Sequence, residues 1–434
     1  MDRLPGFRDF YPEPLPQSEQ WSAAARRHIF DRWRDTARRY GFQEYDGPPL
    51  EPLELYTVKS GAEIVSQLYN FRDKGDREVA LRPEMTPTLA RMVAAYERNY
   101  KKPIKWFAIP QLFRYERQQK GRLREHFQLN ADIVGEAGPG ADAELMALLI
   151  DTLRAVGLSA DDFLVRLSSR QAWRDFFVRH GGQAADEYAF YQIIDKLERE
   201  PAHTSQQGLA ALGFSLAEVR AFIAQGDPTA ELKVILDNLG ARGLGDYVKV
   251  DFGVIRGLAY YTGTVFEAFD RQGQFRAIAG GGRYDSLIQL VSGGKVNLPA
   301  LGFGLGDVVL LELLKARGRL PELRPRAGIF FGMEDEPLRH DSLGWIQQLR
   351  DAGLAVDYAL APAKSDKQFK RALENNPLAI IRVQPEPLLA RVRCLPSGEE
   401  KAFALPGQFE EMKQHLAQLH QIERSLRGDR LLEP

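Results

Sequence analysis

The sequence is poor in cysteine and in long apolar runs. Its 434 residues include one cysteine, Cys394, which excludes an intrachain disulfide and a zinc site built from several cysteines. No window approaches the roughly 18 uninterrupted apolar residues of a membrane span, and the N-terminus lacks the apolar segment of a signal peptide. We therefore expect a cytoplasmic protein that does not enter a membrane.

An excess of charge of one sign is also missing. The 58 basic and 59 acidic residues leave a formal net charge of −1. Such a molecule has no overall field that attracts nucleic acid, so binding of a polyanion must come from a local basic patch. The 44% apolar and 27% charged residues are typical of soluble globular proteins, and the length suffices for two or three domains.

Several motifs of nucleotide-binding proteins and hydrolases are absent as well. The sequence has no G-x-x-x-x-G-K-[ST], no G-x-G-x-x-G after a predicted strand, no H-E-x-x-H and no G-x-S-x-G. If the protein handles phosphates, arginine side chains must bind them. Arginine suits this task, because its planar guanidinium donates two parallel hydrogen bonds to a phosphate and keeps its charge when buried.

Periodic apolar residues predict helices combined with an antiparallel sheet in the first 313 residues. An apolar stripe predicts a helix from Ser18, its N-cap, to about Tyr40; its members are Trp21, Ala25, Ile29, Trp33, Ala37 and Tyr40. Further helices are predicted at 87–100 and 141–156, and strands at 42–45, 104–113, 163–167, 247–252, 264–269 and 275–279. Residues 270–274 would connect the last two strands as a hairpin loop.

The pattern of predicted helices and strands changes twice along the chain. Irregular helical residues 170–246 are interpreted as an inserted helical subdomain, and residues 314–326, rich in Lys, Arg, Pro and Gly, as a linker. Beyond the linker, predicted strands at 328–332, 355–360 and 378–383 alternate with predicted helices at 338–352 and 364–375. This alternation indicates a small α/β domain with a largely parallel sheet.

The segment Arg114–Arg124 concentrates positive charge. Five of its eleven residues are basic and only Glu116 is acidic, while apolar residues precede and follow it. This pattern predicts a hairpin whose loop presents cations to a polyanion.

Polar side chains lie near the ends of predicted strands: Glu84, Arg114, Gln128, Asp132, Arg256 and Arg283. Gln128 and Asp132 are four residues apart, so both lie on one face of a strand. Such residues could form a pocket with acids for an ammonium group and arginines for phosphate or carboxylate, or they could form surface ion pairs. The glycine triplet 280–282 likewise indicates either a turn or a close approach of backbone to a ligand.

Four motifs decide between these interpretations. They are Leu81-Arg-Pro-Glu-Met-Thr86, Phe113-Arg-Tyr-Glu-Arg-Gln-Gln-Lys-Gly-Arg122, Arg256-Gly-Leu-Ala-Tyr-Tyr-Thr-Gly263 and Ala279-Gly-Gly-Gly-Arg-Tyr-Asp285. In order and spacing they resemble those of histidyl-tRNA synthetases, which are class II aminoacyl-tRNA synthetases. The resemblance covers nearly the whole chain, including Leu4-Pro-Gly-Phe-Arg-Asp-Phe10 at the start and Lys364-Ser-Asp-Lys-Gln-Phe-Lys370 in the last domain.

The resemblance implies an α+β fold with a class II antiparallel sheet and flanking helices. The catalytic core would comprise residues 1–169 and 247–313, interrupted by the insertion 170–246, and an anticodon-binding α/β domain would occupy 327–434. The implied reaction is ATP-dependent activation of L-histidine to histidyl-adenylate, followed by transfer to the 3′ end of tRNA(His). The family also implies Mg²⁺ accompanying ATP, and a homodimer with residues 18–49 at its interface.

The family's site residues map onto matching positions of this sequence. Histidine would be bound by Glu84, Thr86 and Gln128 at the ammonium group, and by Asp132, Tyr260, Tyr261 and Tyr284 around the imidazole. Arg114 and Arg256 would be catalytic through the α-phosphate of ATP, and Glu116, Arg122 and Arg283 would complete the ATP site. Arg117, Gln118, Lys120 and Arg124 would contact the acceptor end of the tRNA. The resemblance assigns no protein side chain as a metal ligand.

Several positions depart from the family pattern. Asp132 stands where bacterial relatives often carry Glu, Ala259 where the family usually has Asp, and Gln118 where relatives often carry Pro. We expect the loss at Ala259 to affect groups around the substrate rather than the chemistry itself.

The largest departure is in class II motif 3. This motif normally ends in Gly-x-Glu-Arg, but Val309 occupies the position of the arginine that holds the ATP tail. A charge-assisted hydrogen bond worth about 1.5–3 kcal/mol is therefore missing. Another cation would have to replace it, and Arg122, Arg124 and Arg283 are the candidates.

These departures keep two further functions open. A paralogue of the family serves as a non-catalytic, histidine-binding regulatory subunit of ATP phosphoribosyltransferase, but it typically lacks the anticodon-binding domain. The other alternative is a former synthetase that has lost its catalytic activity and only binds RNA or histidine. Histidine-dependent exchange of pyrophosphate into ATP would distinguish the synthetase from both.

Overall fold

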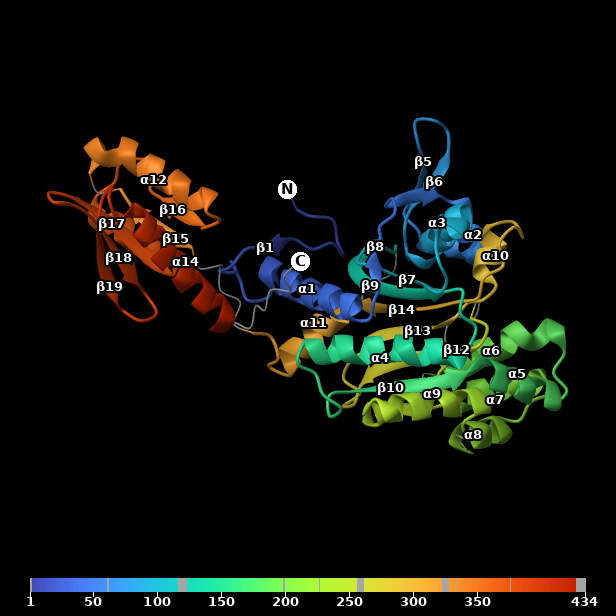
Figure 1. Ribbon diagram of the computed structural model, residues 1–434. Helices are drawn as coiled ribbons and strands as arrows, with labels where there is room; N and C mark the ends of the chain where they lie inside the picture. The colour runs from blue at the N-terminus through green and yellow to red at the C-terminus, as the bar shows by residue number, and fades with distance from the viewer. Residues whose placement is uncertain are drawn as a thin grey trace. The chain divides into compact units, whose positions relative to one another are not determined.

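The computed structural model describes residues 2–60, 62–115, 123–197, 200–225, 227–255, 261–321, 328–333, 335–374 and 376–426. The chain divides into two compact units (Figure 1). Unit 1 comprises Met1–Phe10 with Ala25–Pro321, and unit 2 comprises Tyr11–Ala24 with Glu322–Pro434. Within the described residues, no single helix is both long and apolar enough to cross a membrane.

Unit 1 is built on a nine-stranded sheet in the described residues. Its order is β11-β10-β12-β13-β14-β9-β7-β3, and β8 pairs with β9. The strands are β3 (Gln43–Glu44), β7 (Ile104–Ala108), β8 (Gln111–Phe113), β9 (Glu125–Val134), β10 (Phe163–Ser169), β11 (Val248–Val250), β12 (Thr264–Asp270), β13 (Ala279–Arg283) and β14 (Ala300–Gly306). From β10 to β7 every pair is antiparallel, and only the two terminal strands pair in parallel. The predicted α+β class with a largely antiparallel sheet is confirmed.

Helices flank this sheet. The long helices are α1 (Ala23–Arg39) and α4 (Pro139–Ala155), and α4 contacts β9 and β14. Shorter helices are α2 (Glu54–Ser60), α3 (Thr86–Tyr96), α10 (Leu287–Val291) and α11 (Asp307–Ala316), with 3-10 turns η1 (Ala62–Gln67), η2 (Glu97–Asn99) and η4 (Gly245–Tyr247). Apolar side chains of α3 and α10 pack on Trp106, Val134 and Ala300, which lie on one face of the sheet. This face carries the candidate site.

Two further groups of elements complete unit 1. A small antiparallel sheet contains β4 (Leu50–Pro52), β5 (Asn70–Arg72) and β6 (Glu78–Leu81). Between β10 and β11 the chain forms α5 (Arg170–Arg179), η3 (Ala184–Asp186), α6 (Glu187–Lys196), α7 (Ala202–Ala211), α8 (Leu216–Gln225) and α9 (Ala230–Ala241). The ring nitrogen of the buried Trp173 donates to the carbonyl of Phe252 at 2.9 Å, which attaches these helices to the rest of the unit.

The start of α1 differs from its prediction. Its apolar stripe is buried at Ala25, Ile29, Trp33 and Ala37, but the helix begins at Ala23 rather than after Ser18. Trp21–Ser22 is instead strand β2, which pairs with β1 (Phe10–Tyr11). The Ser22 hydroxyl donates to the Glu13 carboxylate at 2.5 Å, and this contact holds the segment extended.

The glycine triplet 280–282 is the second correction. We predicted a strand at 275–279 followed by either a turn or a close approach, but β13 begins at Ala279 and contains the triplet in its interior. A Cβ atom at Gly281 would lie 2.2 Å from the carbonyl oxygen of Gly302 on β14. The turn interpretation is therefore wrong, because these glycines allow close contact between neighbouring strands. The predicted strand 104–113 is likewise two strands, β7 and β8, separated at Ile109 and Pro110.

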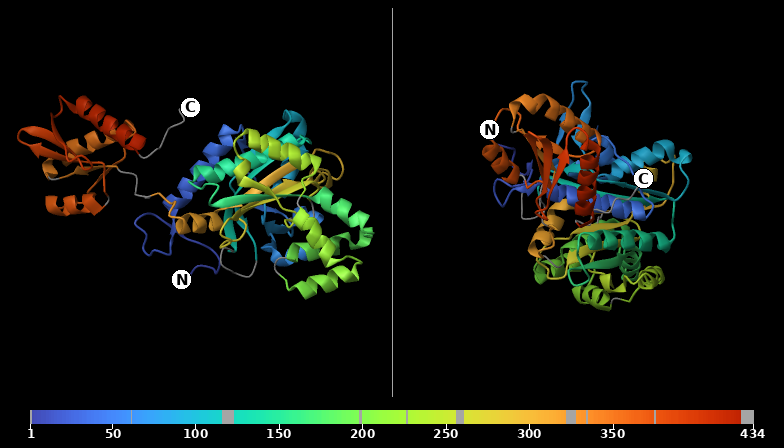
Figure 2. Two further views of the ribbon diagram at one scale, coloured as in Figure 1. Left: turned by 90° about the horizontal axis from the view of Figure 1, so that it is seen from below. Right: turned by 60° about the vertical axis from the view of Figure 1, so that its left-hand side comes forward.

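Unit 2 contains a five-stranded sheet with helices on both faces (Figure 2). Its order is β16-β15-β17-β18-β19, and the strands are β15 (Ile329–Gly332), β16 (Val356–Tyr358), β17 (Ala379–Pro385), β18 (Leu388–Cys394) and β19 (Glu400–Ala404). The helices are η5 (Glu336–Leu338), α12 (Arg339–Asp351), α13 (Ser365–Glu374) and α14 (Phe409–Leu426). The α12 and α14 helices cover one face and α13 covers the other. The three predicted strands, β15, β16 and β17, pair in parallel as expected. The sheet as a whole is mixed rather than largely parallel, because β18 and β19 were not predicted and pair antiparallel.

The close contact at Gly281 gives a first prediction. Gly281→Ala should lower the free energy of unfolding by about 1–3 kcal/mol or more, because the added methyl meets backbone that cannot rotate away. Gly306→Ala, at the end of β14, is the matched control, since a Cβ there has no atom within 4 Å. Urea denaturation of both variants would test this, and equal midpoints would contradict the tight packing of β13 against β14.

Candidate active site

The candidate site is centred on the carboxyl group of Asp132. This residue lies on β9, opposite Trp106 of β7 and Gly302 of β14, and is 1% exposed. The hydroxyl of Tyr284, also buried, donates to Asp132 Oδ1 at 2.5 Å. The other carboxyl oxygen, Oδ2, is buried and has no hydrogen-bond partner among the described residues. One edge of the carboxyl group is therefore satisfied by the protein and the other is not.

Two glycines of β14 make room for the site's side chains. A Cβ atom at Gly302 would lie 1.9 Å from Asp132 Oδ1, and one at Gly304 would lie 2.1 Å from Gln128 Nε2. The side chains of Gln128 and Asp132 therefore both extend over β14, on one face of the sheet, as their spacing predicts. Any larger residue at either glycine would displace them.

Burial changes the acid–base behaviour of the pocket. It raises the pKa of the Asp132 carboxyl to about 7, although the hydrogen bond from Tyr284 opposes this shift. The carboxyl group can therefore be either a neutral donor or a charged acceptor near neutral pH. A ligand that carries an N–H group or a positive charge would favour the charged acceptor.

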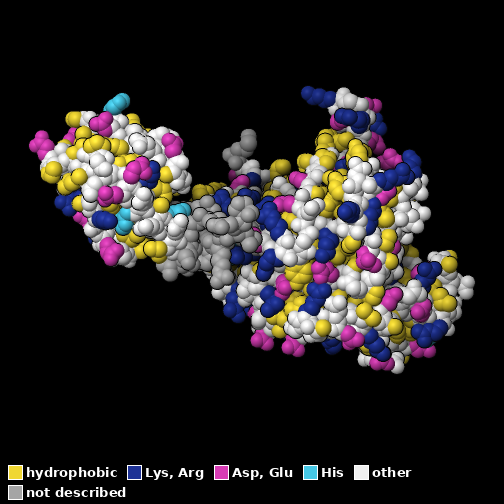
Figure 3. All heavy atoms as spheres, in the orientation of Figure 1, with side chains coloured by type: hydrophobic (Ala, Val, Ile, Leu, Met, Phe, Trp, Pro, Cys, Tyr) yellow, Lys and Arg dark blue, Asp and Glu magenta, His cyan; other side chains and the backbone are white. Residues whose placement is uncertain are grey.

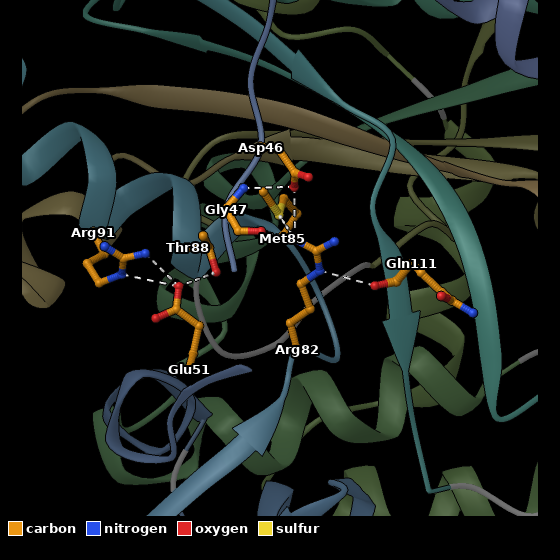
Figure 4. A network of polar contacts seen from close by, with 8 residues as sticks. All are labelled: Asp46, Gly47, Glu51, Arg82, Met85, Thr88, Arg91 and Gln111. Carbon is orange, nitrogen blue, oxygen red and sulfur yellow. Dashed lines mark hydrogen bonds and ion pairs between the residues drawn. The ribbon is translucent and has the colours of Figure 1, made fainter. Parts of the chain in front are cut away.

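A polar network holds the segment before α3 in place (Figure 4). The buried Arg82 donates to the Asp46 carboxylate at 3.1 Å and to the carbonyl oxygens of Gly47 at 2.7 Å and Gln111 at 3.1 Å. Beside it, Glu51 accepts from Thr88 at 3.0 Å and from Arg91 at 2.7 Å. These contacts join strands distant in the sequence to α3. Sequence reasoning missed them, because nothing in the motif showed which backbone groups Arg82 would meet.

The network positions two predicted site residues. The half-buried Glu84 lies between the fixed Arg82 and the start of α3, and the buried Thr86 is the first residue of that helix. The half-buried Arg114 joins them, because its Nε atom donates to the carbonyl of Pro83 at 3.1 Å. Glu84, Thr86 and Arg114 therefore surround one short segment of chain.

Arg124 lies at the far end of the basic segment, next to Arg114. The backbone N–H of Arg114 donates to the Arg124 carbonyl at 2.9 Å, so the two residues form the base of the predicted hairpin. The Arg124 guanidinium lies 4.4 Å from the centre of the Tyr115 ring. Five predicted site residues of the loop, namely Glu116, Arg117, Gln118, Lys120 and Arg122, lie outside the described residues.

Arg283 has different surroundings from those predicted. It is buried, and its guanidinium donates to Asp142 at 2.6 Å and to the carbonyl oxygens of Glu136 at 3.0 Å and Gly138 at 2.8 Å. These contacts bind β13 to the start of α4. The predicted role of Arg283 in ATP binding stays a prediction, and the structure gives the side chain a second, structural role.

The aromatic residues of the site form one cluster. Tyr284 is part of the apolar cluster that includes Trp106, and the half-buried Tyr261 and Tyr45 pack against it. Tyr260 and Arg256, both predicted site residues, lie outside the described residues, as does Ala259. The described part of the site thus combines one buried carboxyl group with four aromatic rings.

A buried ion cluster supports the opposite face of β9. Arg8 donates to Glu125 of β9 at 2.6 Å and to Asp307, the first residue of α11, at 2.9 Å. Asp307 also accepts from the backbone N–H of Phe127 at 3.0 Å. Sequence reasoning did not identify this cluster, although the quoted N-terminal segment Leu4–Phe10 contains Arg8. Its charges fix the register of β9 behind the site.

The chain is similar in sequence and in fold to proteins of one known family. The family model described as "Histidyl-tRNA synthetase" matches residues 13–307. The chain is 43% identical over 419 residues to the histidine–tRNA ligase of Opitutus terrae, which covers 90% of this chain and 92% of that protein. It is 37% identical over 417 residues to the chloroplastic/mitochondrial histidine–tRNA ligase of Arabidopsis thaliana, covering 91% and 83%. The crystal structure of histidyl-tRNA synthetase from Nostoc sp. PCC 7120 has the same fold, with a TM-score of 0.73, 23% identity and coverage of 93% and 97%.

The raised pKa of Asp132 predicts how stability depends on pH. The folded-state pKa of about 7 lies above the ordinary value of 3.8, so the folded protein holds this proton more tightly than the unfolded chain. Stability is therefore lost as pH rises from about 4 to about 7, by up to about 4 kcal/mol from this group. Asp132→Asn should remove this loss, so its stability relative to wild type should increase with pH in denaturant titrations. A constant difference between pH 4 and 7 would contradict the raised pKa.

Proposed function

Because the chain belongs to the histidyl-tRNA synthetase family, we propose that it is a histidine–tRNA ligase. It activates L-histidine with ATP to histidyl-adenylate and transfers the histidyl group to the 3′ end of tRNA(His). The observation that supports this most directly is the half-satisfied carboxyl group of Asp132 inside an aromatic cluster. A flat ring with a nitrogen-bound hydrogen fits such a pocket, and imidazole is such a ring.

In this proposal the ends of the substrate are bound by different elements. Asp132 accepts the N–H of the imidazole, and Tyr261 and Tyr284 pack beside the ring, together with Tyr260. Glu84, Thr86 and Gln128 bind the α-ammonium group, which a carboxylate and two neutral oxygens suit. Gln128 and Asp132 each lie two residues, or roughly 7 Å, from position 130 on the same strand. One amino acid bound over that position can therefore contact both side chains.

The chemistry requires positive charge rather than a base. The substrate carboxylate attacks the α-phosphorus of ATP, pyrophosphate leaves, and negative charge increases on the phosphate oxygens in the transition state. Arg114 and Arg256 stabilise that charge from fixed positions. The hydrogen bond from Arg114 Nε to the Pro83 carbonyl holds this guanidinium at the chain segment that carries Glu84, where the proposed substrate binds.

Mg²⁺ would accompany ATP in this reaction. Among the described residues, no three His, Cys, Asp or Glu side chains converge as metal ligands. We therefore propose that the ion is held mainly by the phosphates of ATP. When bound, it would neutralise part of their charge.

The atypical motif 3 is part of the proposal. Val309 lies half-buried in the first turn of α11 and offers no charge to the ATP tail. Of the three candidate replacements, Arg283 is already bound to Asp142, and Arg122 lies outside the described residues. None of the three is excluded by this, and Arg122 and Arg124 both belong to the basic segment. We assign Arg124 to the ATP tail or the tRNA acceptor end, together with Arg117, Gln118 and Lys120.

Unit 2 offers a second basic surface. A pocket there is lined by Ser365, Asp366, Phe369, Ile380, Arg382, Arg391, Arg393 and Glu400. Arg382 and Arg391 are opposite each other on β17 and β18, and Arg393 lies two residues along β18 on the same face. Three guanidinium groups beside an aromatic ring suit the phosphates and bases of single-stranded RNA. We propose that residues 327–434 bind the anticodon through this face.

The remaining features of the proposal concern assembly and location. We propose a homodimer with residues 18–49 at its interface, and we place tRNA charging in the cytoplasm. The alternative function, a histidine-binding regulatory subunit of ATP phosphoribosyltransferase, would also use the Asp132 pocket. It is disfavoured because the relatives from Opitutus terrae and Arabidopsis thaliana, which match about nine tenths of the chain, are both histidine–tRNA ligases.

Pyrophosphate exchange tests the proposed function. The purified protein should exchange labelled pyrophosphate into ATP only when L-histidine is present. Arg114→Ala, prepared in parallel, should reduce the rate by roughly 10²–10³, the effect of removing one fixed charge donor from a transition state. This variant also controls for host synthetase in the preparation. Histidine binding without exchange at millimolar ATP would favour the regulatory subunit instead.

The basic pocket of unit 2 gives a separate prediction. The double variant Arg382→Ala/Arg393→Ala should raise the KM for tRNA(His) in aminoacylation about tenfold or more, because two exposed cations are lost from a phosphate-binding surface. Exchange without tRNA should be unchanged. Lys413→Ala on α14, which covers the opposite face of the sheet, removes a charge elsewhere and should leave charging unchanged. Equal charging by all three proteins would exclude this face as the anticodon site.

A further inference from the structure

One tyrosine of the aromatic cluster has no role in the mechanism above. Tyr45 follows β3 directly, and its backbone N–H donates to the carbonyl of Phe107 on β7 at 2.9 Å. Its ring centre lies 5.5 Å from that of Trp106, against the cluster that contains Tyr284. The backbone and the ring are thus fixed by neighbours on both sides.

The Tyr45 hydroxyl group is buried and unsatisfied. Its oxygen has no hydrogen-bond partner among the described residues. Burial, and then the charge of the nearby Asp132, raise the pKa of this hydroxyl well above its ordinary value, so it stays a protonated donor. Leaving such a group unpaired costs about 1–3 kcal/mol. A tyrosine that only packed on Trp106 would not need the oxygen, because phenylalanine would pack equally well.

The same pocket contains a second unsatisfied atom, Asp132 Oδ2. Asp132 is the register partner of Trp106, so the side chains of these two residues lie side by side on one face. Tyr45 packs on Trp106 in the cluster that also contains Tyr284, the hydrogen-bond donor to Asp132, so the hydroxyl and the carboxyl group belong to one cluster. The pocket therefore presents one free donor and one free acceptor, and its other carboxyl oxygen is already bound by Tyr284.

A neutral imidazole has the complementary pair of groups. One ring nitrogen carries a hydrogen and donates, and the other is an acceptor. We propose that Tyr45 is a specificity-determining residue whose hydroxyl donates to one imidazole nitrogen while Asp132 Oδ2 accepts from the other. This inference rests on the proposed histidine specificity of the site. It gives both buried polar atoms, which have no hydrogen-bond partner among the described residues, a partner on the substrate.

Such a pair would recognise histidine by both nitrogens. An amino acid of similar shape that lacks either the donor or the acceptor leaves one buried group of the protein unpaired. Sites built in this way reject the wrong substrate strongly, because the unpaired group was dehydrated on binding and gains nothing in return.

Tyr45→Phe tests this inference by removing the oxygen while keeping the ring on Trp106. In pyrophosphate exchange, the KM for L-histidine should increase about tenfold, the effect of one lost hydrogen bond in a buried site. The KM for ATP and the kcat should change by less than about threefold by the same reasoning. The inhibition constant of histidinol, which keeps the imidazole but has no carboxylate, should increase by the same factor as the KM for histidine.

Stability measurements separate recognition from support of the fold. Because an unpaired hydroxyl is removed, ligand-free Tyr45→Phe should unfold at the same urea concentration as wild type or a higher one, while added histidine should stabilise it less. Tyr96→Phe, with a side chain 66% exposed on α3, is the matched control and should change neither value. A histidine KM within twofold of wild type, or a reduced kcat with unchanged KM, would overturn the inference. Absence of exchange in the wild-type protein would instead overturn the proposed function.

Discussion

The burial of the Asp132 carboxyl group is the constraint on which the candidate site depends. A carboxyl group that is almost without solvent contact loses much hydration energy, and the hydrogen bond from Tyr284 returns only part of it. The position is tolerated because Gly302 leaves space for the carboxyl group above β14. A site that keeps such a group ready for a substrate is less stable without the substrate than a fully apolar core would be.

Charged side chains behind and beside the pocket keep this arrangement rigid. Arg8, Glu125 and Asp307 come from the N-terminus, β9 and α11, and removing any one of them would leave a buried charge without its partner. Arg82 similarly joins the segments at Asp46 and Gln111 to the start of α3. The proposed substrate-binding residues therefore lie on or next to segments whose positions are fixed by buried ion pairs. Preorganisation of this kind is what charge stabilisation in a transition state requires.

Sequence periodicity predicted the parts of this structure that depend on local pattern. The stripe of α1 and the shared face of Gln128 and Asp132 follow from helix and strand geometry alone, and the structure has both. Periodicity did not predict features that depend on contacts between segments distant in the sequence. The interior position of Gly281 in a strand depends on the backbone of β14, and the partners of Arg283 come from the start of α4. The sequence identifies Tyr45 only as the end of a short strand, because its hydroxyl group is distinguished by burial among residues that are distant in the sequence.

The arginines of this protein fall into two groups that the sequence alone cannot separate. Arg8, Arg82 and Arg283 are buried, and carboxylates or carbonyl oxygens of the chain itself engage them. Arg114 and Arg124 stand at the base of a basic segment and are only partly buried. Basic side chains on the face drawn in Figure 3 are spread among acidic ones, in keeping with a net charge of −1. In such a protein, phosphate binding depends on where the fold places its cations. In the proposed site Val309 offers no charge to the ATP tail, so another cation must supply it. Arg283 is a candidate that already donates to Asp142 and thereby joins β13 to the start of α4.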